Sequence, residues 1–479
     1  MKSLAKDTAI YGLSSIIGKF LNYLLVPLYT YVLARTSDYG IVTNLYAWTA
    51  LLLVLLTYGM ETGFFRFANR EDYDAGTVYK TAYITLLISS ALFSMLIVIF
   101  HQPVANVLGY PDHAEFVEMM FVTVAVDAFA SIPFAYLRNQ KRPVLFAALK
   151  LLFVVLNIGF NILFLVVLGK NDVFYVFLSN LMATTIQTLC LLPFTMPKGG
   201  HFDSVALKEM LRYSLPLLVL GVAGIMNQTL DRILFPYLYP FDDAEAQLGI
   251  YGACFKVAMV MMMFTQAFRY AYEPFVFSKH KDRNSVEAYA DAMKYYIIFS
   301  YLILLGVIFY LDIFRYIISS AYWEGLKIVP VVLWTYVFQG VYFNLSFWYK
   351  LTDETKWGAY FSLIGLVITL VLQIVGVPRI GYWASCGSSL VCYFVIMVLS
   401  YVIGQKKAPI PYDLKSIGGY TLLTFGLLAV YYYIRHYFDL NMWVLMAIGT
   451  FFIAVYIIKM TRRDFPLSGL PVVGKYFRN

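Results

Sequence analysis

Long apolar runs separated by short polar segments fill most of this sequence. A helix needs roughly 20 apolar residues to cross a membrane. Fourteen runs meet that length: 8–33, 39–65, 78–100, 115–137, 143–169, 173–194, 211–239, 247–276, 289–311, 327–349, 357–376, 380–403, 415–435 and 440–460. The runs are continuous rather than alternating, which favours helices over membrane strands. The pattern therefore predicts an all-α polytopic membrane protein with about 14 transmembrane helices.

The distribution of Lys and Arg predicts how these helices are oriented. Cytoplasmic loops carry the excess of Lys and Arg in most membrane proteins. With the N-terminus inside, cytoplasmic segments hold 24 of the 36 basic residues and external segments hold 6. An error of one helix would remove this bias, so the bias also supports fourteen spans. We predict cytoplasmic N- and C-termini and a bacterial cytoplasmic (inner) membrane.

Composition agrees with a membrane protein and excludes several function classes. Hydrophobic residues make up 61% of the chain and charged residues 13%, whereas a soluble domain carries about 25% charged residues. The net charge of +8 comes from basic residues scattered over short loops, so we predict no nucleic-acid partner. The four cysteines lie inside apolar runs without metal-type spacing, so we predict no metal site.

Two stretches of the chain resemble each other at an offset of about six helices. SDYGIVTNLYAW (37–48) and AQLGIYGACFKV (246–257) each contain a Gly-Ile pair at the start of a predicted helix. METGFFRF (60–67) and AYEPFVFS (271–278) are similar further along. An even number of intervening spans makes this a parallel repeat about an axis normal to the membrane.

The repeat predicts two six-helix lobes followed by two additional helices. We expect an N-terminal lobe at 1–196, a C-terminal lobe at 205–408, and a segment 409–479 that holds the last two helices and a cytoplasmic tail.

Charged side chains inside the apolar runs are the candidate functional residues. A charge at the centre of a bilayer costs at least about 2.5–3.5 kcal/mol, so such residues face protein or a water-filled cavity. We predict that six residues line a substrate-binding central cavity between the lobes: Lys19, Asn22, Lys150, Arg232, Lys256 and Arg269. We assign four acids to ion coupling or gating: Glu61, Asp127, Asp231 and Glu273.

A structural interpretation of the same charges stays open. Arg269 and Glu273 are spaced i,i+4 on one helix, and Asp231 is adjacent to Arg232. Such pairs can neutralise each other and fix helix packing without binding a ligand. Lys19 and Lys150 have no acid near them in the sequence, which favours a functional role, although Asp127 can pair with either across helices.

Four stretches, in order, resemble a known family. LVPLYTYVLARTSDYGIVTNLYAW (25–48), YGMETGFFRF (58–67), YSLPLLVLGVAGIMNQTLDRILF (213–235) and LGIYGACFKVAMV (248–260) are similar to patterns of the Wzx-type polysaccharide flippases. These flippases are the O-antigen branch of the multidrug/oligosaccharidyl-lipid/polysaccharide (MOP) exporter superfamily.

The resemblance implies a fold, a substrate and partners. It implies two six-helix lobes in a V around a central cavity, and alternating access. It also implies transfer of an undecaprenyl-diphosphate-linked oligosaccharide from the cytoplasmic to the periplasmic leaflet, for cell-surface polysaccharide such as the O-antigen of lipopolysaccharide. Membrane lipids, a polysaccharide polymerase and glycosyltransferases are the expected partners. No cofactor is implied beyond a coupling proton or sodium ion.

Two other functions compete with this interpretation. A MATE-like antiporter of small cations calls for an unpaired acid in the first helix, where this chain has Lys19. A membrane-embedded polysaccharide polymerase or ligase needs catalytic groups on the external side, yet the predicted external loops are short. The five histidines are not clustered, and no nucleophile triad, metal or phosphate-loop motif is present. We therefore predict a transporter and not an enzyme.

Overall fold

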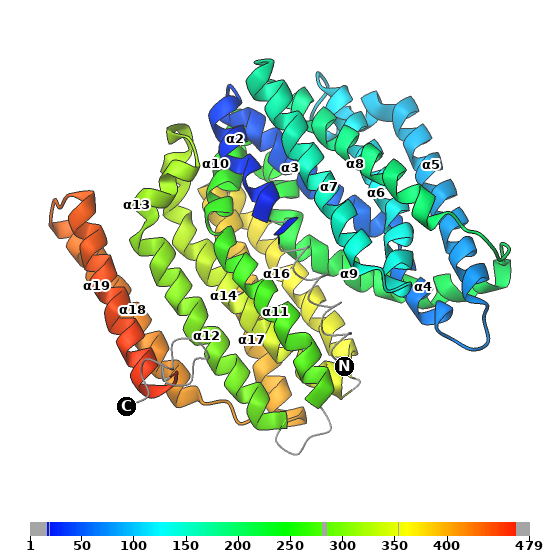
Figure 1. Ribbon diagram of the computed structural model, residues 1–479. Coiled ribbons are helices and arrows are strands. Elements are labelled where there is room, and N and C mark those ends of the chain that lie inside the picture. Colours follow the sequence, from blue (N-terminus) through cyan, green and yellow to red (C-terminus); the bar gives the residue numbers. More distant parts are fainter. Residues whose placement is uncertain (1–16, 19, 280–284, 353, 466–479) are drawn as a thin grey trace. The chain divides into compact units, whose positions relative to one another are not determined.

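The computed structural model describes residues 17–465 except 19, 280–284 and 353. The helices are α2 (Leu25–Val32), α3 (Thr36–Thr57), α4 (Met60–Ala68), α5 (Ala75–Leu108), α6 (Ala114–Asn139), α7 (Pro143–Asn161), α8 (Val173–Thr195), α9 (Ser204–Leu238), α10 (Ala244–Val257), α11 (Met259–Lys279), α12 (Ser285–Phe309), α13 (Leu311–Phe314), α14 (Val329–Leu345), α15 (Phe347–Leu351), α16 (Lys356–Ile380), α17 (Tyr382–Lys407), α18 (Leu414–Tyr437) and α19 (Met442–Arg463), with a π-helical segment η1 (Ile162–Val167) and 3₁₀ segments η2 (Arg315–Ile317) and η3 (Ser320–Ile328). The described residues contain no β-strand, so the all-α prediction is confirmed (Figure 1).

The number of membrane-crossing helices agrees closely with the prediction. Among the described residues, twelve helices are long and apolar enough to cross a membrane, and the bent pair α10–α11 brings the number to 13. The apolar helix Phe20–Val32 is the described part of the first predicted span. The protein is therefore a multi-pass membrane protein.

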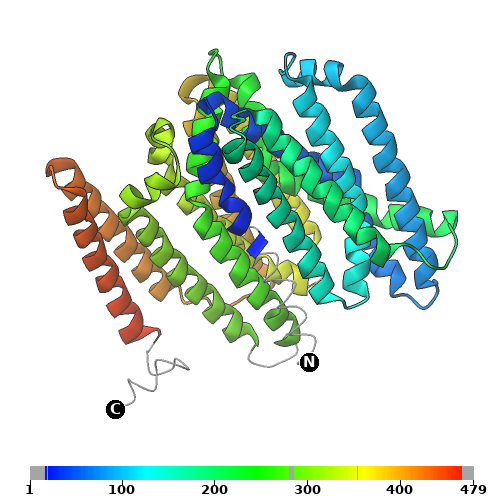
Figure 2. The ribbon, with the colours of Figure 1, turned by 45° about the horizontal axis from the view of Figure 1, so that its top comes forward.

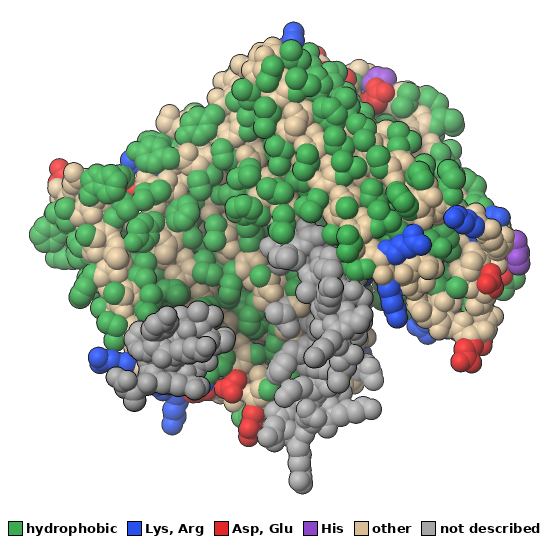
Figure 3. Space-filling view, in the orientation of Figure 1, with side chains coloured by type: hydrophobic (Ala, Val, Ile, Leu, Met, Phe, Trp, Pro, Cys, Tyr) green, Lys and Arg blue, Asp and Glu red, His purple; other side chains and the backbone are tan. Residues whose placement is uncertain are grey.

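The surface is what a lipid environment requires. Hydrophobic side chains cover most of the visible face, while charged side chains lie mainly toward the ends of the helices (Figure 3). On α5, the side chains of Ile88 and Ile99 are 61% and 58% exposed. Water would disfavour apolar surface on this scale, whereas hydrocarbon chains do not.

Short polar side chains set where several helices begin. The first backbone N–H groups of a helix lack partners within the helix, and an N-cap oxygen satisfies one of them. Asp74, Asp172, Asp203 and Asp413 each accept such a hydrogen bond, at the starts of α5, α8, α9 and α18. All four lie in the short polar segments that separate the apolar runs, so each cap also marks where a run begins.

By internal packing, the described chain divides into two compact units. The first comprises the described residues up to Ala253 together with Lys356–Cys392, and the second comprises Cys254–Thr355 and the described residues from Tyr393 onward. The division into lobes at 1–196 and 205–408, and the V-shaped arrangement, stay predictions.

In the first unit, α6 is the central helix. It packs against α3, α5 and α8, and most of its apolar stretch is buried (Figure 1). At one end of α6, an aromatic cluster joins it to α4 and α5. Phe64 and Tyr79 are buried there, and the Tyr79 ring stacks on Tyr136 with 4.0 Å between ring centroids. This packing fixes α4, which carries one of the predicted acids, against α6.

The two Gly-Ile pairs of the predicted repeat lie against each other in the first unit. A Cβ atom on Gly40 would lie 1.9 Å from the carbonyl oxygen of Glu245, and one on Gly249 would lie 2.0 Å from that of Thr36. Only glycine permits so close an approach, so the backbones of α3 and α10 are in direct contact at their N-terminal ends.

Two of the predicted spans are interrupted. The second run is divided into α3 and α4 by Tyr58 and Gly59, which both have left-handed backbone angles, with φ of 33° and 71°. The eighth run bends by 48° between α10 and α11. The eighth predicted span therefore consists of two helices with different directions, whereas the second is interrupted at Tyr58 and Gly59 but still forms one span over Thr36–Ala68.

In the second unit, α12 is the central helix. It packs against α14, α18 and α19, and α18 and α19 lie side by side (Figure 2). Gly449 in α19 allows a close approach to α12, because a Cβ atom there would lie 2.6 Å from Cβ of Phe309. The last two predicted helices are thus packed onto this unit.

Candidate functional site

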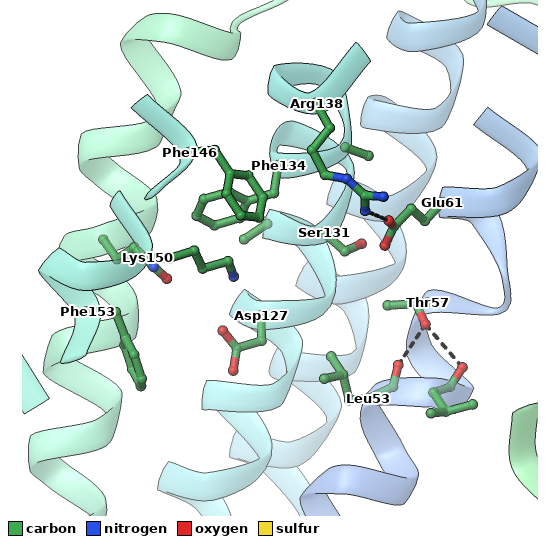
Figure 4. A pocket seen from close by; sticks show the side chains of 14 residues that line it. Leu53, Thr57, Glu61, Asp127, Ser131, Phe134, Arg138, Phe146, Lys150 and Phe153 are labelled. Carbon is green, nitrogen blue, oxygen red and sulfur yellow. Dashed lines mark hydrogen bonds and ion pairs between the residues drawn. The ribbon is translucent and has the colours of Figure 1, made fainter. Parts of the chain in front are cut away.

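The first unit encloses a cavity of about 500 Å³ that contains three of the predicted site residues. Its lining comes from α3, α4, α6, α7 and α8 and comprises Leu53, Val54, Thr57, Glu61, Asp127, Ala130, Ser131, Phe134, Ala135, Arg138, Phe146, Lys150, Phe153 and Gln187. Figure 4 shows the charged side chains directed into this space from α4, α6 and α7. We call it the Asp127 cavity.

α6 supplies six of the lining residues, and four of them are polar, charged or aromatic. Asp127, Ser131, Phe134 and Arg138 are spaced i, i+4, i+7 and i+11, which places them in one stripe along the helix. Asp127 is near the middle of α6 and Arg138 is at its last turn. At 1.5 Å per residue, the stripe extends about 16 Å from the middle of the span toward its predicted cytoplasmic end.

At that end of the cavity, Glu61 and Arg138 form an ion pair. Nη1 of Arg138 lies 2.5 Å from Oε1 of Glu61, and both side chains are close to half exposed. Arg138 also lies over the ring of Phe65, 4.9 Å from its centroid. The core cluster that packs α4 against α6 brings Glu61 to Arg138.

Deeper in the cavity, Lys150 and Asp127 face the same space (Figure 4). Nζ of Lys150 lies 3.8 Å from the centroid of the Phe134 ring, a cation–π contact. Within the described residues, no carboxylate oxygen lies within 4.0 Å of this Nζ. The ammonium group is thus held by a ring and remains available to an anion.

A buried glutamine positions α7 in the cavity wall. Gln187 of α8 donates from Nε2 to the carbonyl oxygen of Leu149, at 2.9 Å. Leu149 precedes Lys150, so this bond fixes the turn of α7 that carries the lysine. Neither Arg138 nor Gln187 was among the predicted site residues. The i,i+11 spacing from Asp127 is the signal that points to Arg138.

Asp231 and Arg232 lie in the same unit but outside the lining of the Asp127 cavity. Asp231 is 3% exposed, and Tyr251 donates a hydrogen bond to its Oδ2 at 2.5 Å. Nε of Arg232 lies 3.3 Å from Oδ1 of Asp231, and Nη2 donates to the carbonyl oxygen of Gln228. The bond from Tyr251 connects α10 to α9, and the two contacts of Arg232 lie within α9, which agrees with the structural interpretation of this pair.

Lys256 and Arg269 belong to the second unit. Lys256 is in the last turn of α10, next to the bend. The guanidinium group of Arg269 lies 4.5 Å from the centroid of the Phe343 ring. Asn22 precedes α2, and its Oδ1 is buried with no hydrogen-bond partner among the described residues. Lys19 and the Glu273 side chain lie outside the described residues. The predicted roles of all these residues stay predictions.

The fold and the residues of the first unit match a known family. The model of the polysaccharide biosynthesis protein family matches residues 4–272, more than half of the chain, and the MatE model matches residues 243–375. The chain therefore belongs to the polysaccharide biosynthesis protein family, and it has the fold of the MOP exporter superfamily. Among curated proteins, no significant match was found.

Solved structures share this fold at low sequence identity. A lipid II flippase, MurJ, in an inward closed conformation has a TM-score of 0.74 and 15% identity, covering 94% of this chain and 99% of that one. An inward-facing multidrug resistance MATE family transporter of the MOP superfamily has a TM-score of 0.66 and 11% identity, covering 83% and 94%. A MOP superfamily transporter from Pyrococcus furiosus has a TM-score of 0.54 and 14% identity, covering 84% and 95%.

Proposed function

We propose that the protein is a flippase for a lipid-diphosphate-linked oligosaccharide. Membership in the polysaccharide biosynthesis protein family supports a role in glycan assembly, and one structural neighbour is a flippase for a lipid-linked substrate. The observation that carries the proposal is the Asp127 cavity, with the ammonium group of Lys150 turned toward it. A diphosphate that leaves water needs cationic donors, and Lys150 lines this cavity with no carboxylate oxygen of the described residues within 4.0 Å of its Nζ.

The same cavity supports coupling of transport to an ion. Its four charged lining residues are two acids and two bases, which cancel when all are ionised. A bound diphosphate would leave an excess of negative charge in an apolar region, which is costly. We propose that Asp127 takes up a proton or a sodium ion when substrate binds. Glu61 stays paired with Arg138 and acts in gating.

The finer assignments follow the family resemblance. We propose a Wzx-type flippase that acts on an undecaprenyl-diphosphate-linked oligosaccharide, in the inner membrane of a bacterium, with both termini cytoplasmic. Lys19, Asn22, Arg232, Lys256 and Arg269 are proposed as further substrate-binding positions, and Asp231 and Glu273 as further coupling or gating positions. A polysaccharide polymerase and glycosyltransferases are the proposed partners.

Translocation in proteoliposomes tests the proposal. The protein is reconstituted with a lipid-diphosphate oligosaccharide in one leaflet, and a membrane-impermeant glycosidase reports its arrival in the other. We expect protein-dependent translocation, and a loss of about tenfold or more for Lys150→Gln, because a charge-assisted bond to the diphosphate is removed. Lys170→Gln is the matched control, because Lys170 is exposed in the loop between α7 and α8.

Coupling is tested in the same vesicles. Imposed proton or sodium gradients should change the rate of translocation by the wild-type protein but not the rate of translocation by Asp127→Asn. Equal rates for wild type and Lys150→Gln would remove Lys150 from the site, and an unchanged gradient response in Asp127→Asn would remove Asp127 from coupling.

The second candidate is an antiporter of small cations, favoured by the MatE match over residues 243–375. An antiporter would bind its substrate at an ionised acid such as Asp127 and would not need Lys150. Efflux of a fluorescent organic cation from the same vesicles, without translocation of any lipid-linked glycan, would replace the flippase proposal with this one.

A further inference from the structure

A second charged cavity lies in the second unit, at the C-terminal end of α12. It has a volume of about 380 Å³, and its charged lining residues are Asp312, Arg315, Lys327 and Arg435. These come from the segment between α12 and α14 and from the last turn of α18. We call it the Asp312 pocket. Three of the six basic residues predicted to be external lie in this one place.

The pocket has more positive than negative charge. Arg435 donates from Nη2 to Oδ1 of Asp312 at 3.0 Å, and Nη1 of Arg315 lies 3.8 Å from the same oxygen. Asp312 is buried, and it is the only carboxylate in the lining as described. No carboxylate oxygen within the described ranges lies within 4.0 Å of Nζ of Lys327. Three cations therefore share one anion.

Arg315 is held in place by an aromatic ring rather than by a second acid. Its guanidinium group lies 4.5 Å from the centroid of the Trp323 ring. Nε1 of Trp323 donates to the carbonyl oxygens of Arg315 and Ile318, at 3.0 and 3.2 Å, so the ring itself is fixed. Nε of Arg315 is buried and has no partner among the described residues. The segment thus presents a fixed guanidinium with a donor to spare.

Apolar and aromatic side chains surround these charges. Leu311, Leu326 and Pro330 line the pocket, together with Tyr431 and Tyr432. At the same end of α18, Tyr437 and Phe438 are 68% and 54% exposed. Exposed aromatic residues at the end of a membrane helix mark the interface between headgroups and hydrocarbon. The lining therefore suits a ligand that carries an anionic group next to an apolar chain.

We propose that the Asp312 pocket binds the phosphate headgroup of an anionic membrane phospholipid at the predicted external interface. Guanidinium groups bind phosphate oxygens in a forked arrangement, and Arg315 and Arg435 flank the same point. Lys327 adds a flexible charge at the rim, and the apolar lining accommodates the start of the acyl chains. Basic pockets between membrane helices bind anionic lipid headgroups on the cytoplasmic side of membranes, and the same chemistry suits a headgroup at the external interface. The site does not depend on the proposed flippase activity.

Lipid binding by the purified full-length protein tests this proposal. The protein in a neutral detergent is titrated with short-chain phosphatidylglycerol and, separately, with phosphatidylcholine. We expect phosphatidylglycerol to bind more tightly, and Lys327→Gln and Arg315→Gln each to weaken it by about tenfold, because each removes a charge-assisted contact. Lys170→Gln and Arg379→Gln are the matched controls, because both residues are exposed and predicted external and neither lines the pocket.

Comparison of several ligands shows which phosphate-containing molecule the pocket binds. Equal binding of the two lipids, or equal weakening in the control variants, would overturn the proposal. Inorganic phosphate that binds as tightly as phosphatidylglycerol would also overturn it, in favour of a free-anion site. Tighter binding of a polyprenyl diphosphate would assign the pocket to that lipid instead. Arg315→Lys keeps the charge but loses the fork, so it should bind phosphatidylglycerol better than Arg315→Gln does.

Discussion

Two acids on different helices of the first unit show how the environment decides the role of a residue. Asp127 and Asp231 both lie within apolar runs, and the sequence alone gave both the same assignment. In the structure, Asp127 lines a cavity, whereas Asp231 is buried and bonded to Tyr251 and Arg232. Tyr251 lies on a different helix from Asp231, so local sequence patterns could not identify this partner.

The bond between Tyr251 and Asp231 leads to a stability prediction. Tyr251→Phe leaves a carboxylate that is 3% exposed without one of its donors. An unsatisfied buried group of this kind costs about 1–3 kcal/mol. We expect the free energy of unfolding in detergent to fall by that amount, as measured by denaturant titration. Tyr360→Phe, at an exposed position, is the control and should unfold like the wild type.

Asp413 leads to a prediction about pH. Hydrogen bonds from Ser416, including one from its backbone N–H at 3.0 Å, lower the pKa of the Asp413 carboxyl group. A lowered pKa in the folded state adds stability that is present above the pKa of the unfolded state and is lost as the pH falls through the folded-state value. The exposed position keeps the effect of the cap to about 1 kcal/mol or less.

The corresponding measurement compares thermal unfolding of wild type and Asp413→Ala at several pH values. We expect the variant to be less stable at pH 7, and the difference to shrink as the pH falls below about 4, where the carboxyl group is protonated. A difference that stays constant down to pH 3 would show that the carboxylate charge does not contribute to the cap.

At the scale of elements, the sequence predicted the long helices but did not predict where they are interrupted. The apolar runs predicted the long helices, because hydrocarbon leaves a backbone few alternatives to the helix. The bend between Val257 and Met259 has no proline or glycine to mark it. The break at Tyr58 requires a non-glycine residue with positive φ, which tertiary contacts impose. Sequence patterns do not report such contacts.

The candidate site depends on these contacts still more strongly. Sequence analysis identified Glu61, Asp127 and Lys150 as charges within apolar runs, and all three line one cavity. Arg138 was assigned to a cytoplasmic loop, because it lies at the end of its run. Its partner Glu61 is on another helix, α4, which begins only after the break at Gly59. The pairing of the two could not be read from the chain.

The contact between α3 and α10 gives a prediction for this scale. Gly249→Leu places a side chain where the carbonyl oxygen of Thr36 already lies. Overpacking of this kind costs about 1–3 kcal/mol or more, because two backbones must separate. We expect a lower unfolding temperature and lower yield in detergent. Gly426→Leu is the control, because a Cβ atom at Gly426 meets no atom within 4 Å. Equal melting of the two variants would contradict the close contact.

At the scale of the whole molecule, the described residues hold twelve helices that can cross a membrane, or 13 with the bent pair α10–α11, in the order of the fourteen predicted spans. The structure itself contains no membrane, so the direction of insertion rests on the basic residues of the loops. Hydropathy and charge determine topology through physical rules that act on the chain locally. They leave open which helices pack together, because most apolar surfaces can pack against one another equally well.

Topology gives the last prediction. Reporter domains inserted after residues 141 and 200 should indicate a cytoplasmic location of those loops. Reporter domains inserted after residues 170 and 439 should indicate an external location. These positions lie in loops between described helices, so the insertions leave the helices intact. Agreement at all four positions would establish the orientation, and an inverted result at any one of them would contradict the fourteen-span order.

The glycine contact between α3 and α10 also has an energetic consequence. At Gly40 and Gly249 the two backbones meet with no side chain between them, and the carbonyl groups that they meet, those of Glu245 and Thr36, belong to the helices themselves. Moving these helices apart would therefore uncover few groups that need new hydration and would forfeit mainly dispersion contacts, which are individually weak. Two arrangements of such a junction can differ little in free energy, so a modest binding or ion-gradient energy is enough to choose between them.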